Sequence, residues 1–169
     1  IARLDIKGKK LIKGIRFEGV RVIGDPNSAA RKYAKDGADE LLYIDAVASL
    51  YGRNSIASIL KITSNEVFIP ITASGGIRSI TDAKNLVMAG ADKIAVNTAG
   101  LRDPKLLKDL VETFGSQCVV VSIQARRIPG EKSWEAMSEM GREKSGRDVL
   151  DWIQEVQTIG VGEILLTSV

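Results

Sequence analysis

The stretch GADELLYID, residues 37–45, joins a glycine that can stop a helix to a short apolar strand that ends in a carboxylate. The same corner returns as GADKI at 90–94 and as GVGEI at 160–164. Three copies of one helix-to-strand corner predict that the chain repeats a single strand–helix unit. Repetition of this kind favours a parallel α/β barrel over a doubly wound sheet.

The segments around these corners alternate in the same way. Apolar runs predict strands at 2–6, 40–45, 67–72, 92–97, 119–123 and 163–168, and periodic stretches predict helices at 27–35, 53–62, 80–88, 105–114 and 146–158. Asp25, Ser79 and Asp103 stand where helix caps are expected. A complete barrel needs eight units and about 250 residues. We therefore expect a (β/α)8 barrel of TIM type, of which residues 1–169 carry about the first six units as a single domain, incomplete at the C-terminus.

Two segments interrupt the alternation. Residues 7–13 hold four lysines and a glycine, and predict a basic loop that can wrap an anionic substrate and close over it. Residues 126–144 are charged, contain Pro129-Gly130 and alternate around Trp134, which predicts a hairpin inserted between a strand and a helix.

Composition excludes several classes of function. The net charge of +3 is spread along the chain and only 5% of residues are aromatic, so nucleic-acid binding is not expected, and an anionic small molecule fits the charge equally well. No apolar run approaches the roughly 20 residues that cross a bilayer, and no membrane association is expected. Histidine is absent, which removes imidazole bases and the commonest metal ligand, so acid–base chemistry falls to Asp, Glu, Lys or Tyr.

The single cysteine bears on the cellular compartment. Cys118 opens the apolar run 118–123 and is expected to be a buried small hydrophobic residue rather than half of a disulfide. This usage predicts a reducing, cytoplasmic location.

Polar residues gather at the predicted carboxyl ends of the strands, which face one mouth of a parallel barrel. They are Asp5, Asp45, Ser74, Gly75, Gly76, Asn97, Thr98, Gln124 and Thr167. Asp5 alternates with Leu4 and Ile6. A carboxylate in an apolar strand must either have an ionic or hydrogen-bonding partner or serve the function of the protein. The glycine pair, with Asn97 and Thr98 one strand over, offers donors to a phosphate, although tight turns and helix caps explain these residues equally simply.

The three corners also place charge at the other ends of the strands. Each brings one charged residue to a strand start: Glu40, Lys93 and Glu163. Two acids and a base at equivalent positions predict a ring of ion pairs around the barrel axis. The alternative is three separate, exposed strand-end charges.

Several segments resemble the cyclase subunit family of imidazole glycerol phosphate synthase, the HisF family. They are LDIKGKKLIKG (4–14), GDP (24–26), DELLYIDAVAS (39–49), PITASGGI (70–77), GADKIAVNTA (90–99), FGSQCVVVSIQARR (114–127) and GEILLTS (162–168). The resemblance implies a (β/α)8 barrel without cofactor or metal. It implies that ammonia from a glutaminase partner, HisH-like, is joined to the bisphosphorylated substrate PRFAR, giving imidazole glycerol phosphate and AICAR.

The resemblance also implies roles for residues. Asp5 matches the catalytic acid–base residue on the first strand. The expected substrate and phosphate site comprises Lys13, Asp45, Ser74, Gly75, Gly76, Asn97, Thr98 and Thr167. Glu40, Lys93 and Glu163 match the charged gate that admits ammonia, and Asp92 and Gln117 lie at the expected glutaminase interface.

One position departs from the family pattern. The family carries its second catalytic aspartate where this chain has Gln124. An amide can hydrogen-bond a substrate, but it cannot exchange a proton as a carboxylate does. Three hypotheses stay open: the PRFAR cyclase itself, a paralogue that amidates a surface-polysaccharide sugar from acetamido to acetamidino, and a non-catalytic barrel that docks a glutaminase.

Overall fold

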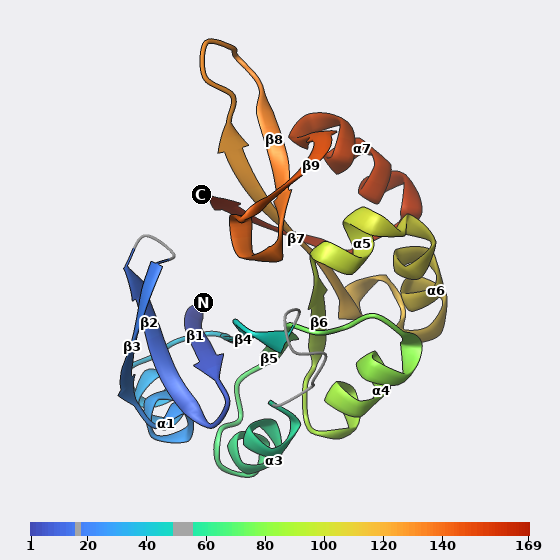
Figure 1. Ribbon diagram of the computed structural model, residues 1–169. Coiled ribbons are helices and arrows are strands. Elements are labelled where there is room, and N and C mark those ends of the chain that lie inside the picture. Colours follow the sequence, from blue (N-terminus) through green and yellow to red (C-terminus); the bar gives the residue numbers. More distant parts are fainter. Residues whose placement is uncertain (16–17, 49–55) are drawn as a thin grey trace. The chain divides into compact units, whose positions relative to one another are not determined.

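The computed structural model describes residues 1–15, 18–48 and 56–169, which form two compact units, Ile1–Ile94 and Ala95–Val169. Parallel strands alternate with helices along both units (Figure 1). The predicted fold class is confirmed: the chain has the α/β organisation of part of a TIM barrel. The expectation that residues 1–169 are a single domain stays a prediction.

The described part of the first unit contains five complete strands in one sheet. Its elements are β1 (Ala2–Lys7), β2 (Lys10–Ile15), β3 (Glu18–Gly24), α1 (Pro26–Lys35), β4 (Leu41–Asp45), α3 (Ala57–Glu66), β5 (Ile71–Ser74) and α4 (Ile80–Met88). The strand order is β3-β2-β1-β4-β5, and β1, β4 and β5 are parallel. Strands β2 and β3 are antiparallel additions beside β1.

The prediction of a basic loop at 7–13 is wrong. Strand β1 continues to Lys7 and β2 begins at Lys10, so only two residues form the turn between them. Gly8 has a φ of +60°, the left-handed conformation that a tight two-residue hairpin requires. The lysines therefore lie along a hairpin, whose apolar residues Leu11 and Ile12 are buried.

Other elements of the first unit follow local signals closely. Asp25 accepts a hydrogen bond from the Ser28 amide at 2.8 Å, and the Ser79 hydroxyl accepts one from the Asp82 amide at 3.1 Å, so both predicted caps are confirmed. The predicted helix at 53–62 begins within 49–55, outside the described residues, and α3 runs on to Glu66.

The predicted strand at 67–72 is displaced in the structure. Strand β5 occupies Ile71–Ser74, and Phe68 is 89% exposed. Pro70 has no amide hydrogen to donate to a neighbouring strand, and the Ile71 amide donates to the Asp92 carboxylate at 2.8 Å. The strand thus starts after the proline.

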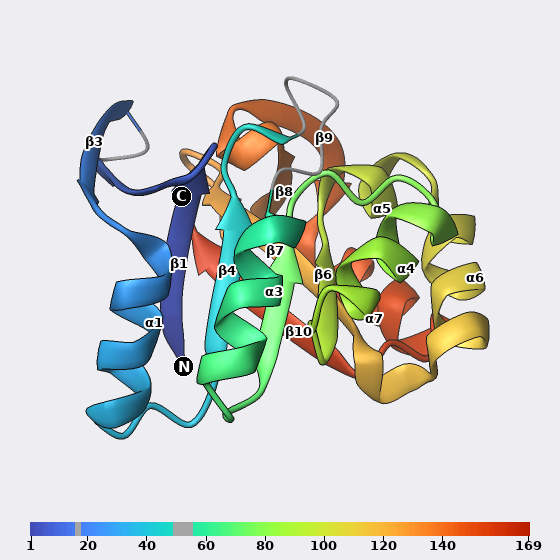
Figure 2. The same ribbon diagram turned by 90° about the horizontal axis from the view of Figure 1, so that it is seen from below.

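One face of the first sheet is covered by helices. The Tyr43 side chain is fully buried, and its hydroxyl lies 2.9 Å from that of Thr63 in α3 and 3.5 Å from the Pro26 carbonyl in α1. Leu4 pairs in register with Tyr43, so it projects to the same face. Figure 2 shows α1 and α3 beside β1 and β4. Arg3 and Asp5, which alternate with Leu4, belong to the opposite face.

The second unit begins at Ala95, within β6 (Lys93–Val96). Its elements are α5 (Thr98–Arg102), α6 (Pro104–Phe114), η1 (Ser116–Cys118), β7 (Val119–Arg127), β8 (Trp134–Ser138), η2 (Glu139–Gly141), β9 (Glu143–Asp148), α7 (Val149–Ile159) and β10 (Glu163–Ser168). Strand β10 pairs parallel with β7, while β8 and β9 form an antiparallel extension on the other side of β7. The predicted hairpin and the strand at 163–168 are confirmed.

Three expectations for the second unit need correction. Helix α5 was not predicted, because residues 98–102 look like a loop between a strand and the Asp103 cap. The last helix begins at Val149 instead of 146, since the hairpin strand continues to Asp148, whose carboxylate caps the helix. Cys118 is half-buried in η1 rather than buried in a strand.

Within the described ranges, no helix is long and apolar enough to cross a bilayer.

Candidate functional site

Asp5 lies within β1, between neighbours on both sides. It pairs with Ile44 of β4 and with Ile12 of β2, and it belongs to the sheet face opposite α1 and α3. Its carboxylate is half-buried and accepts a hydrogen bond from the Arg3 guanidinium at 2.9 Å. The sequence-based reading missed this Arg3 partner, although two-residue spacing in a strand places both side chains on one face. Asp5 is therefore a charge-paired carboxylate that remains accessible.

Lys13 lies on β2, in register with Arg21 of β3. Both cations are exposed. They carry positive charge along the hairpin next to β1, which suits an anionic ligand.

The turn after β5 packs tightly against the end of β4. A Cβ atom at Gly75, whose φ is +107°, would lie 2.6 Å from the Asp45 carbonyl oxygen. Gly76 also has a positive φ of 72°. The Asp45 carboxylate is buried and accepts a hydrogen bond from the Val47 amide at 3.1 Å, while Ser74 is buried at the end of β5. Glycine at 75 is thus required by close backbone approach, which agrees with the tight-turn alternative, while the phosphate-binding role of the glycine pair stays a prediction.

The strand-start end of the first unit carries a cluster of polar side chains. The Lys93 ammonium lies 3.2 Å from one Glu40 carboxylate oxygen, and the Thr72 hydroxyl donates to the other at 2.5 Å. Asp92 is exposed, and its carboxylate accepts from the Ile71 amide. The structure therefore brings together two of the three predicted gate residues, and adds Thr72 to them.

Gln124 is only 6% exposed, near the carboxyl end of β7. Its amide nitrogen donates to the Met140 sulfur at 3.9 Å. Its side-chain oxygen is buried and has no hydrogen-bond partner within 1–15, 18–48 and 56–169. Thr167 of β10 is its register neighbour. Gln124 thus sits in a buried environment with an unused acceptor.

Asn97 and Thr98 connect β6 and α5 to the hairpin. The Asn97 amide nitrogen donates to the carbonyls of Ser122 at 2.9 Å and Met137 at 3.2 Å, which uses both of its hydrogens. The Thr98 hydroxyl donates to the Asn97 side-chain oxygen and accepts from the Glu139 amide at 3.0 Å. These side chains hold the inserted hairpin in place, which leaves the Asn97 amide no spare donor for a phosphate.

The opposite end of the second unit holds the remaining predicted residues. The Gly162 amide donates to the Ser116 carbonyl at 3.1 Å, which packs the corner before β10 against η1. Gln117 and Glu163 are both exposed at this end. Across the part of the chain that the structure describes, no group of three or more His, Cys, Asp or Glu side chains could hold a metal ion.

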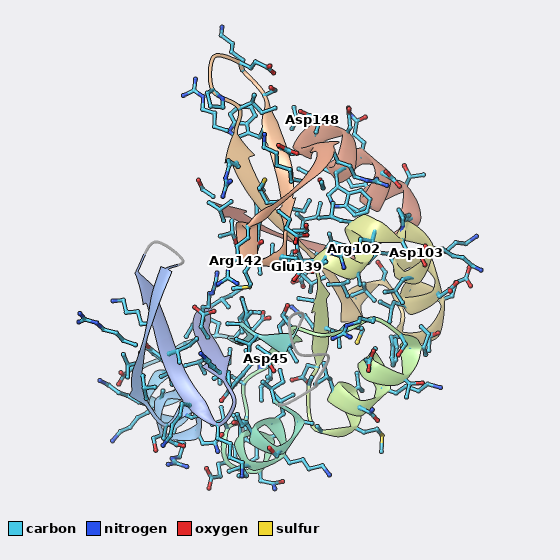
Figure 3. All side chains as sticks on the ribbon, viewed as in Figure 1. Asp45, Arg102, Asp103, Glu139, Arg142 and Asp148 are labelled. Atoms are coloured by element: carbon cyan, nitrogen blue, oxygen red, sulfur yellow. The ribbon has the colours of Figure 1, made fainter. Side chains whose placement is uncertain are left out.

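Sequence reasoning also missed Glu139 and Arg102. The Glu139 side chain is buried, and its carboxylate forms an ion pair with the Arg102 guanidinium at 3.2 Å (Figure 3). Arg102 follows Thr98 by one helical turn on α5. The segment around Glu139 is charged and rich in small residues, which is typical of a surface turn, so only its tertiary position reveals the burial.

Comparison with known proteins agrees over the full chain. The family model described as "Histidine biosynthesis protein" matches residues 1–169. Three relatives are each named "Imidazole glycerol phosphate synthase subunit HisF". The relative from Legionella pneumophila is 56% identical over all of this chain and 79% of its own length. Those from Dictyoglomus turgidum and Streptococcus sanguinis are each 45% identical over 98% of this chain, and 66% and 65% of their own lengths. The chain thus spans 65% to 79% of these relatives.

Proposed function

Because the chain belongs to the histidine biosynthesis protein family and is similar throughout to HisF subunits, we propose that it is the cyclase subunit of an imidazole glycerol phosphate synthase. In this function it joins ammonia to PRFAR and releases imidazole glycerol phosphate and AICAR. The 56% identity to a HisF subunit over 169 residues supports this assignment.

The position of Asp5 is the observation that carries the proposal. Ring closure with ammonia requires proton transfer, and a carboxylate can accept and return a proton. Asp5 lies on the face of its sheet opposite the helices, and its carboxylate is partly accessible. Arg3 orients this carboxylate through a 2.9 Å hydrogen bond. Asp5 is therefore the proposed acid–base residue of the first unit.

The proposed partner is a HisH-like glutaminase at the strand-start ends. In the first unit these ends carry the Glu40–Lys93 ion pair with Asp92 beside it in the chain, and in the second unit they carry Gln117 and Glu163. A part-buried ion pair can open and close to a small neutral molecule such as ammonia. We propose Glu40, Lys93 and Glu163 as the ammonia gate, and Asp92 and Gln117 as interface residues. The expected cytoplasmic location stays a prediction.

Gln124 favours a second candidate function. Its neutral amide lies in the buried interior of the second unit, at the position where the family has a carboxylate. A paralogue that amidates an acetamido sugar with ammonia from the same type of partner would need a differently equipped centre. This candidate shares the gate and the glutaminase with the first, and differs from it in its substrate and in the residue at position 124.

Turnover of the full-length protein with ammonium salts separates these functions. We expect conversion of PRFAR without any glutaminase, and we expect Asp5→Asn to lower its rate about 10²–10⁴-fold by removing proton transfer. Asp39→Asn, which changes an exposed carboxylate at a strand-start corner, is the control. Amidation of an acetamido sugar in place of PRFAR cyclisation would support the paralogue. Binding of a glutaminase without turnover of either substrate would leave only the docking role.

A further inference from the structure

Glu139 is a buried carboxylate whose hydrogen-bonding capacity is half used. The residue is 9% exposed, and one carboxylate oxygen pairs with Arg102 at 3.2 Å. The other oxygen is buried and has no hydrogen-bond partner among the described residues. A buried carboxylate oxygen without a hydrogen-bond partner is costly, so this position calls for a ligand that supplies one.

The backbone that presents this carboxylate is held in an unfavourable conformation. Glu139 and Met140 have φ values of 49° and 60°, and they are the two non-glycine residues with positive φ in the described chain. Positive φ is unfavourable for residues that carry a Cβ atom, and strain of this kind concentrates at functional sites. Gly141 completes the turn at a φ of 80°.

The strained turn is attached to the candidate site on both sides. The Glu139 amide donates to the Thr98 hydroxyl at 3.0 Å, and the Met140 sulfur accepts from the Gln124 amide at 3.9 Å. The Arg126 guanidinium donates to the Gly141 carbonyl at 2.5 Å. Gln124 and Glu139, whose buried side-chain oxygens lack partners among the described residues, are thus linked through the Glu139–Met140 turn.

We propose that Glu139 transfers protons on the β7 side of the site, in place of the carboxylate that is missing at Gln124. The inference rests on the proposed function. When ammonia condenses with a carbonyl carbon, a C–N bond forms, the C–O bond breaks, and two protons of the nitrogen leave with the oxygen as water. One carboxylate that accepts a proton from nitrogen and returns it to oxygen serves both halves of this exchange.

The simpler alternative gives Glu139 only a structural role, in which its ion pair with Arg102 anchors the hairpin. The two roles make different demands on the side chain. Anchoring needs an acceptor for the guanidinium, which an amide also provides, whereas proton transfer needs a carboxylate. Glu143 offers a matched control, because it also approaches Arg102, at 3.5 Å, from a more exposed position on β9.

The experiment compares Glu139→Gln with Glu143→Gln in the full-length protein, using PRFAR and ammonium ions. For Glu139→Gln we expect kcat to fall about 10²–10⁴-fold, while KM for PRFAR and the melting temperature stay unchanged. Glu143→Gln is expected to retain the full rate. In the Glu139→Gln background, Gln124→Asp should recover turnover, because it returns a carboxylate to a position that contacts the same turn.

Each outcome has a distinct meaning. A wild-type protein that does not convert PRFAR overturns the proposed function, and this inference with it. An active wild type with an equally active Glu139→Gln variant overturns the inference alone. Equal losses of rate and melting temperature in both Gln variants would show that the carboxylates only anchor Arg102, which also overturns it.

Discussion

The Glu40 carboxylate and the Lys93 ammonium form an ion pair, 3.2 Å between Oε2 and Nζ, although 53 residues separate them in the chain. The Thr72 hydroxyl donates to the second carboxylate oxygen, so the acid is held from two sides. Both side chains of the pair are largely buried, at 14% and 22% exposed. A pair in this setting is fixed in geometry more firmly than an exposed one.

Glu40→Gln tests whether this pair controls ammonia entry. The amide keeps an acceptor for Thr72 but removes the counter-charge of Lys93. We expect glutamine-dependent turnover with the glutaminase to fall about tenfold, as expected for a loss near 1.4 kcal/mol, while turnover with ammonium salts is retained. Glu66→Gln, which breaks the exposed pair with Arg31, should change neither rate. Equal losses in both assays would contradict a gating role.

Gln124→Asp tests whether the chemistry of the family is latent in this chain. The substitution introduces a titratable carboxylate at a position that is 6% exposed, beside the Thr167 register neighbour. We expect PRFAR cyclisation to rise, because a carboxylate exchanges protons and an amide does not. A sugar-amidating paralogue should instead lose its native activity. A folded variant that binds glutaminase without faster cyclisation would show that more than one residue separates it from the usual enzyme.

Gly75→Ala should be strongly destabilising. The added methyl would meet the Asp45 carbonyl oxygen at 2.6 Å, in a backbone with a φ of +107°. We expect a loss of about 2–4 kcal/mol in the free energy of unfolding, measured by urea denaturation. Gly8→Ala provides the comparison, since its φ is +60° but its Cβ would meet nothing within 4 Å. Similar losses at both glycines would show that backbone conformation alone, rather than close approach, decides the residue.

Tyr43 should make stability fall in alkali. Burial raises the pKa of its phenol from 10.0 to about 12, so the folded protein holds this proton more tightly than the unfolded chain does. The stabilisation is complete below pH 10 and is lost as pH rises through about 12. Between these limits we expect a loss on the order of 2–3 kcal/mol in the free energy of unfolding.

The control for this pH dependence is a second tyrosine. Tyr43→Phe should remove the alkaline loss, and it should also weaken the fold at neutral pH by deleting the hydrogen bond to Thr63. Tyr33→Phe, at an exposed position of α1, should leave the alkaline transition unchanged. An unchanged transition in Tyr43→Phe would assign it to another group.

Local chemistry was enough to predict much of this protein. The glycine corners at 37, 90 and 160 each have positive φ, and each precedes a strand as predicted. Asp25 and Ser79 cap their helices because capping depends only on residues within one turn. The family followed from short segments spread along the chain, and the comparisons confirm it.

Tertiary structure decided the parts that depend on distant residues. The Ile71 amide at the start of β5 donates to the Asp92 carboxylate, 21 residues away in the chain. Residues 8–9 became a hairpin turn because β2 finds a pairing edge on β1. Glu139 looks like a surface residue in the sequence. It is buried because the hairpin folds back on Thr98 and Arg102, and burial is a property of the surroundings that no local pattern of residues encodes.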